Sequence, residues 1–124
     1  MLQQLFTDMM KQDVKPFLSK RGFAKKGLNF TKKTESLIYM FKFQKSAGNT
    51  ADHVMFYVNC GIYAGELAQV QSRAILTAPQ EAECHFRARM REIVESVPDR
   101  FSITPDTNMD DVRDTLLNGL EEVI

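Results

Sequence analysis

Four side chains of this sequence could coordinate a metal ion or form a thiol–imidazole pair. They are the residue types of many tetrahedral zinc sites: His53, Cys60, Cys84 and His85. Along an extended strand, side chains alternate between two faces, so residues seven apart or adjacent point in opposite directions. Cys60 and Cys84 are predicted to face the core, and His85 the opposite side. The spacing therefore predicts neither a metal centre nor a cysteine nucleophile, and we expect no cofactor.

Glycines and carboxyl groups carry the signatures of other kinds of catalytic site. The six glycines follow neither the spacing of a phosphate-binding loop nor that of a dinucleotide-binding turn. No pair of carboxyl groups stands at a spacing that identifies a general acid and a general base. We therefore predict a protein without enzymatic activity. The alternative is an enzyme that acts on a phosphate- or carboxylate-bearing substrate and uses arginines as anchors.

Polar and cationic side chains gather on the predicted sheet face that points away from the core. Arginine binds carboxylates and phosphates through two parallel hydrogen bonds, and Tyr, Met and Arg recur at protein interfaces. We predict that this face binds a protein or an anionic small molecule. The predicted ligand-binding residues are Lys42, Gln44, Tyr57, Asn59, His85, Arg87 and Arg89. Met40 lies on the same predicted face. A solvated face is the other interpretation, since a sheet needs only one buried side.

Lysines near the first predicted strand offer a second mode of binding. Residues 1–46 hold ten Lys or Arg against three Asp or Glu, a local net charge of +7. Lys25, Lys26, Lys32 and Lys33 could contact a nucleic-acid backbone or protect a sheet edge from pairing with other chains. The pI near 6.7 is low for a nucleic-acid binder, so this is the third hypothesis.

The N-terminal segment has the apolar spacing of an amphipathic helix. Its apolar residues recur at intervals of three and four over residues 2–10. Pro16 is expected to kink or restart the helix, with Asp13 as the cap of a second segment. Gly22 suits the left-handed residue that closes a helix.

The middle of the chain alternates with the period of β-strands. This pattern predicts strands over residues 28–31, 37–44, 54–62 and 84–90. The short polar segment 33–36 predicts a hairpin between the first two. The fourth strand has an apolar face, formed by alternate residues from Cys84 to Met90, and a cationic face.

The remaining segments are shorter or less regular. Residues 66–80 fit neither period and are predicted to be irregular or to hold one helical turn, and residues 101–104 are too short to assign. Asn108 can cap a last helix whose apolar stripe runs over residues 109–123. We predict a single α+β domain over residues 1–124: an antiparallel sheet of about four strands, packed on one face by N-terminal and C-terminal helices.

Apolar stretches and cysteines bear on the compartment. The longest apolar runs, residues 37–41 and 54–58, are five residues each, far from the roughly 20 that cross a bilayer. Polar residues interrupt the N-terminal segment, unlike a secretory signal, and two cysteines are too few for a disulfide framework. We predict a cytoplasmic protein that binds no membrane and is a monomer or a homodimer.

Several motifs occur along the chain in a fixed order. They are Gly22-Phe23 with Lys25-Lys26 and Phe30, Phe43-Gln44-Lys45-Ser46, Phe56-Tyr57-Val58-Asn59-Cys60-Gly61-Ile62-Tyr63, and Cys84-His85-Phe86-Arg87-Ala88-Arg89. In this order they resemble the bacterial family known as domain of unknown function 4304. The resemblance implies a small stand-alone bacterial α+β protein and supplies no activity. It draws attention to the polar residues of the motifs, most of which lie on the predicted sheet face that points away from the core: Gln44, Lys45, Ser46, Asn59, Arg87 and Arg89.

Overall fold

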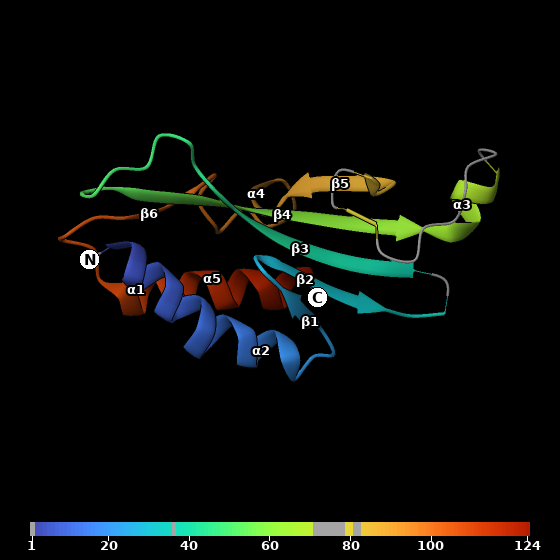
Figure 1. Ribbon diagram of the computed structural model, residues 1–124, viewed down its shortest axis with the longest axis horizontal. Coiled ribbons are helices and arrows are strands. Elements are labelled where there is room, and N and C mark those ends of the chain that lie inside the picture. The colour runs from blue at the N-terminus through green and yellow to red at the C-terminus, as the bar shows by residue number, and fades with distance from the viewer. Residues whose placement is uncertain (1, 36, 71–78, 81–82) are drawn as a thin grey trace.

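The protein is an antiparallel sheet with the N-terminal and C-terminal helices packed along one face (Figure 1). The computed structural model describes residues 2–35, 37–70, 79–80 and 83–124. The elements in chain order are α1 (Leu2–Met9), the π-helix η1 (Met10–Val14), α2 (Lys15–Ser19), β1 (Ala24–Lys26), β2 (Asn29–Lys33), β3 (Leu37–Lys45), β4 (Val54–Ala64), α3 (Gly65–Val70), β5 (Phe86–Arg89), α4 (Met90–Ile93), β6 (Phe101–Ile103) and α5 (Met109–Val123). The predicted α+β fold is confirmed, with six strands in the described part of the chain instead of about four.

The long central strand β4 organises the sheet. On one side it pairs with β3, and the sheet continues in the order β3, β2, β1. On its other side it pairs with two short strands end to end: β6 along Val54–Phe56 and β5 along Asn59–Ile62. Between β5 and β6 the chain leaves this edge, forms α4, and returns. Opposite Tyr57 the edge of β4 is therefore flanked by the end of one strand and the start of the next.

Two strands were missed because each is only three residues long. In β1 all three side chains are exposed, so no apolar alternation marks it. β6 has a buried–exposed–buried pattern, but three residues cannot establish a period. Both strands owe their conformation to pairing with a neighbour.

The predicted strand over residues 84–90 was too long at both ends. Only Phe86–Arg89 is a strand, and Met90 begins α4, where its side chain is buried in the main core. Cys84 lies before the strand and does not face the helices as predicted. It packs with Met40 and Tyr63 on the opposite side of the sheet, because the chain has already turned away from the ladder.

The N-terminal helical segment runs through Pro16 without a new cap. α1 widens into the π-helix η1 before α2, and Pro16 directly follows this wide turn as the second residue of α2. The prediction that Asp13 caps the second segment was wrong, since Asp13 lies inside η1. Gly22 closes α2 with a φ of 90°, and the N–H of Phe23 donates to the carbonyl of Leu18 at 3.0 Å.

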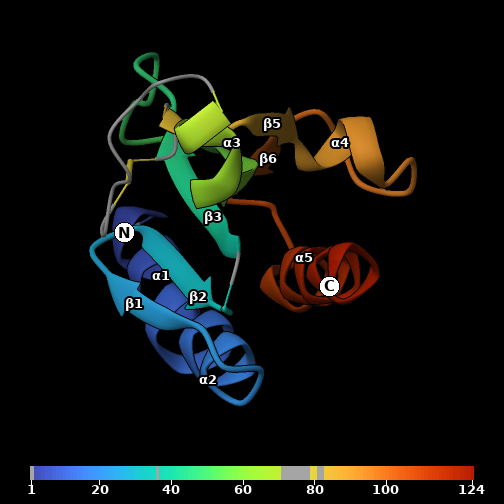
Figure 2. The ribbon, with the colours of Figure 1, turned by 90° about the vertical axis from the view of Figure 1, so that its right-hand side faces the viewer.

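The main hydrophobic core lies between the sheet and α1, α2 and α5, which Figure 2 shows on the same side of the strands. Phe56 is at its centre and is fully buried, as are Leu116 and Leu120 of α5. The predicted cap of α5 is confirmed: Asn108 Oδ1 accepts hydrogen bonds from the N–H groups of Asp110, at 2.9 Å, and Asp111, at 3.4 Å. We call this face of the sheet the helix-covered face and the other the open face.

One end of the open face carries its own small apolar cluster. Met40, Tyr63, Ala68 and Cys84 are buried together there, with Ala68 supplied by α3. The start of the segment 66–80, predicted to be irregular or to hold one helical turn, is helical, as part of Gly65–Val70. Residues 71–78 of that prediction lie outside the described residues. In the described part of the chain, α3 is thus the helix that covers the open face, at one end of it.

Candidate anion-binding site on the open sheet face

Six polar side chains occupy the part of the open face that α3 does not cover. Strand register places Lys42, Asn59 and Arg89 in one row across β3, β4 and β5, and pairs Gln44 with Tyr57 in the next. Arg100 lies one residue before the pair of Phe101 with Phe56, which brings it beside Tyr57. We call this set the cationic face: Lys42, Gln44, Tyr57, Asn59, Arg89 and Arg100.

The gap between β5 and β6 makes two arginines converge on one tyrosine. Arg89 is the last residue of β5, and its guanidinium carbon lies 3.7 Å from the centre of the Tyr57 ring. Arg100 approaches the same tyrosine from the start of β6. Hydrogen bonds from Arg100 and then from Arg89, together with their positive charges, lower the pKa of the Tyr57 phenol below its usual 10.0. Two forked cations thus share one weak acceptor.

The charge of this pair is not neutralised by nearby carboxylates. Within the part of the chain that the structure describes, neither Arg89 nor Arg100 forms an ion pair. Glu92 comes near, but its Oε1 accepts the backbone N–H of Arg89 at 3.0 Å, at the start of α4. The arrangement can accept an anion, because guanidinium groups bind carboxylates and phosphates in two-pronged geometry.

A neutral amide pair forms the floor beside the arginines. Asn59 is only 8% exposed, and its Nδ2 donates to Gln44 Oε1 at 2.9 Å. The contact fixes both side chains across β3 and β4, so they shape the site without adding charge. Lys42, half-buried next to Asn59, adds a third cation.

The other predicted site residues lie toward the α3 end of the same face. His85 packs against Tyr63, with ring centres 4.9 Å apart, and its Nδ1 accepts the N–H of Ala64 at 3.1 Å. His85 is therefore engaged beside the apolar cluster and apart from the Tyr57 pair, and Met40 is buried inside that cluster. Arg87 is exposed and stands across from Gly61, between the two ends.

Sequence reasoning missed Arg100, the residue with the largest effect on Tyr57. It follows the Pro98 turn and precedes a strand too short to recognise, so no alternation assigned it to a face. The register of β6 against β4 is the signal that finds it. That register depends on the pairing of β6 with β4 in the folded protein, and it cannot be recognised in a sequence of three residues.

The lysines proposed for nucleic acid do not form one group. In the register of β1 and β2, Lys25 and Lys32 fall on the helix-covered side, and Lys26 and Lys33 on the open side. Lys25 instead joins three lysines from other elements around a cleft of about 310 Å³ between α1, η1, α2, β1 and β3. The lysines of this four-lysine cleft are Lys11, Lys15, Lys25 and Lys45.

The two cysteines lie on opposite faces of the sheet. Cys60 lies on the helix-covered face, and Cys84 in the cluster on the open face. Among the described residues no three His, Cys, Asp or Glu side chains form a group that could hold a metal ion. In the same part of the chain no helix is long and apolar enough to cross a membrane.

Comparison with known proteins gives a family and no activity. The family described as Domain of unknown function (DUF4304) matches residues 14–124, which include all six strands and the whole cationic face. Curated proteins and solved structures gave no match. The match covers most of the chain and agrees with the motifs seen in its sequence, and so the chain belongs to the DUF4304 family.

Proposed function

We propose that this protein is a binding module that holds an anionic group, a carboxylate or a phosphate, between Arg89 and Arg100 on the cationic face. The anion would belong to a protein partner or to a small molecule. The observation that carries the proposal is the convergence of two guanidinium groups on Tyr57 without a carboxylate of the described residues between them. Two like charges held together gain most from an anion that both can bind.

The rest of the cationic face supports this reading. Lys42 adds charge beside the arginines, and the Asn59–Gln44 contact keeps the floor rigid. A rigid floor matters because ordering a mobile site would subtract from the affinity. The backbone of Arg89 is also held in place. Arg89 is the last residue of β5, and its N–H donates a hydrogen bond to the carboxylate of Glu92.

Inorganic sulfate provides the first test, because it resembles a phosphate group and keeps its charge at alkaline pH. We expect sulfate to compete with Tyr57 for the two arginines and to raise the pKa of Tyr57 toward 10.0. The lowered pKa favours the phenolate, so by linkage sulfate affinity falls as the pH rises through the pKa of Tyr57. NMR titration of a ring-labelled tyrosine sample, with and without sulfate, measures both effects.

The matched variants separate this site from general surface charge. Arg89→Gln/Arg100→Gln is expected to weaken sulfate binding at least about tenfold, because hydrogen bonds to charged groups are lost. Lys15→Gln/Lys20→Gln removes the same charge from exposed positions at the N-terminal helices and should keep the affinity within about twofold. Equal losses in the two variants, or sulfate shifts away from Tyr57, would remove the proposal.

An enzyme acting on a phosphate- or carboxylate-bearing substrate is the alternative, with the same arginines as anchors. Tyr57 would then be the nearest titratable group, and its lowered pKa would suit proton transfer. Hydrolysis of p-nitrophenyl phosphate that disappears in Tyr57→Phe would favour this alternative. Sulfate binding without any turnover favours the binding module.

Nucleic-acid binding is the third candidate, and it is favoured by the four lysines that surround one cleft. Lys45 extends over the ring of Phe6, with its Nζ 5.4 Å from the ring centre, and the other three lysines approach from α1–η1–α2 and β1. If thymidine homopolymer binds there, affinity must fall steeply with salt. Lys25→Gln/Lys45→Gln should then reduce the slope of log K against log[salt] by about 1.5.

The control for this prediction is Lys26→Gln/Lys33→Gln, on the open side of β1 and β2. It should leave the salt slope of the homopolymer unchanged. Fluorescence anisotropy at several salt concentrations gives both slopes. A slope near zero in the wild-type protein would end the nucleic-acid hypothesis, and an equal reduction in both variants would place binding outside the four-lysine cleft.

A further inference from the structure

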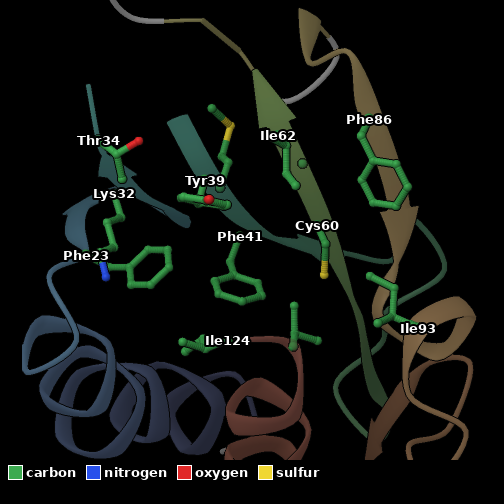
Figure 3. A pocket seen from close by; sticks show the side chains of 13 residues that line it. Phe23, Lys32, Thr34, Tyr39, Phe41, Cys60, Ile62, Phe86, Ile93 and Ile124 are labelled. Atoms are coloured by element: carbon green, nitrogen blue, oxygen red, sulfur yellow. The ribbon is translucent and has the colours of Figure 1, made fainter. Parts of the chain in front are cut away.

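A second, apolar cavity lies on the helix-covered face, on the other side of the sheet from the arginines. Its volume is about 550 Å³, and Figure 3 shows side chains from β2, β3, β4, β5, α4 and α5 around it. Most of its wall is aliphatic or aromatic. The side chains that the argument uses are Lys32, Tyr39, Cys60, Ile62, Phe86 and Ile93.

The cavity exists because the sheet is longer than the helix that covers it. The fifteen residues of α5 extend about 22 Å, whereas the eleven residues of β4 extend about 36 Å. Figure 1 shows the C-terminal end of α5 near the middle of β3 and β4, which continue toward α3. Beyond this point, α5 no longer covers the apolar side chains that the strands direct to this face.

Large apolar side chains at the mouth of the cavity are exposed to solvent. Phe86 of β5 and Ile124, the residue after α5, are each 50% exposed, and Ile93 of α4 is 43% exposed. Three such groups around one hollow form an apolar patch of the kind that marks a binding site. A ligand that covered them would gain the free energy of removing apolar area from water.

Lys32 places one positive charge at the rim of this apolar wall. Its stem lies over Gly22, where even a Cβ atom would come within 3.3 Å of Lys32 Cε. Figure 3 shows its ammonium nitrogen beside Phe23 at one side of the cavity. Lys32 forms no ion pair with a carboxylate of the described residues. An apolar hollow with a single cation at its edge is complementary to a molecule with an apolar chain and an anionic head.

We propose that this cavity binds a monocarboxylate with an apolar chain of medium length. The chain would lie against Cys60 and Ile62 and under Phe86, and the carboxylate would pair with Lys32 at the rim. At the ~30 Å³ that a water molecule occupies in the liquid, the volume corresponds to roughly 18 non-hydrogen atoms, which leaves room for such a molecule. This site is independent of the anion site on the cationic face, which lies across the sheet.

Three probes with the same chain and different heads test the proposal: decanoate, 1-decanol and decylamine, each below its micelle-forming concentration. We expect decanoate to bind most tightly and decylamine least, because only the carboxylate is attracted to Lys32. Amide shifts of Cys60, Ile62 and Phe86 in NMR spectra would place the chain, and calorimetry would give the affinities.

Lys32→Met keeps the apolar stem and removes the charge. It should weaken decanoate about tenfold and leave 1-decanol within about twofold. Lys26→Met makes the same change on the open side of the sheet and should affect neither probe. In the Arg89→Gln/Arg100→Gln variant, the decanoate-induced shifts of Cys60, Ile62 and Phe86 should match those of the wild type, so failure of the anion site and failure of this one are distinguishable.

Three results would overturn the proposal. One is an absence of shifts at the cavity with all three probes. A second is equal affinity for decanoate and 1-decanol, since Lys32 would then select no carboxylate. The third is self-association, measured by analytical ultracentrifugation, that buries Phe86 and Ile93 and prevents decanoate from binding. The occupant of the cavity would then be a second copy of the chain.

Discussion

Replacing Phe56 with alanine is expected to lower the free energy of unfolding by about 3–5 kcal/mol. Phe56 is fully buried at the centre of the main core. Its ring centre lies 4.9 Å from that of Phe6 and 5.1 Å from that of Phe101, which stacks on it. The substitution removes contacts between β4, α1 and β6 at once and leaves a cavity that rigid strands cannot close.

Phe86→Ala is the matched control, because it deletes the same atoms from a half-exposed ring. It should cost well under about 1.5 kcal/mol, since surface positions contribute little. Urea unfolding followed by circular dichroism gives both values. Phe56→Leu, which keeps most of the apolar volume, serves if the alanine variant does not fold. Equal losses at Phe56 and Phe86 would show that the aromatic stack does not hold the core together.

Apolar alternation predicted the elements that are long and bury one face. The pattern of β3 and β4, and the helical stripes of α1 and α5, survive in the structure because each buries side chains at regular spacing. The pattern failed where tertiary contacts decide. β1 exists only as the partner of β2, and Met90 leaves the strand of Arg89 because it turns into the core as the first residue of α4.

The residues of the cationic face were predictable only on the strands whose alternation the sequence shows. Lys42, Gln44, Tyr57, Asn59 and Arg89 fall on one face as alternation required, and register then brings Lys42, Asn59 and Arg89 into one row. Parity could not show that α3 covers the end where His85 lies. It also could not find Arg100 or the apolar cavity, since both depend on where short elements stop.

The two candidate sites share one strand, and their independence follows from its alternation. Tyr57 and Asn59 of β4 point to the open face, whereas Cys60 and Ile62 point to the cavity. Each site is built where the covering layer ends: the cationic face beyond α3, and the cavity beyond α5. The lengths of the helices relative to the sheet thus decide which parts of the sheet stay accessible.

A valine in place of Gly119 is expected to cost about 2–3 kcal/mol and to weaken the anion site as well. Gly119 lies on the buried side of α5, and a Cβ there would stand 2.6 Å from Cγ1 of Val97 and 3.0 Å from Cε of Met90. Met90 can turn aside, but Val97 is branched and only 2% exposed. The segment between β5 and β6 must therefore move.

That segment carries Arg89 at one end and Arg100 at the other, so its displacement should alter how both approach Tyr57. We expect Gly119→Val to lower the free energy of unfolding in urea titrations and to weaken sulfate binding several-fold, about threefold or more for each ~0.7 kcal/mol lost at the site. Asn118→Val, at the exposed neighbouring position, should change neither. A folded Gly119→Val protein with unchanged sulfate affinity would show that the packing of α4 on α5 does not set the spacing of the two arginines.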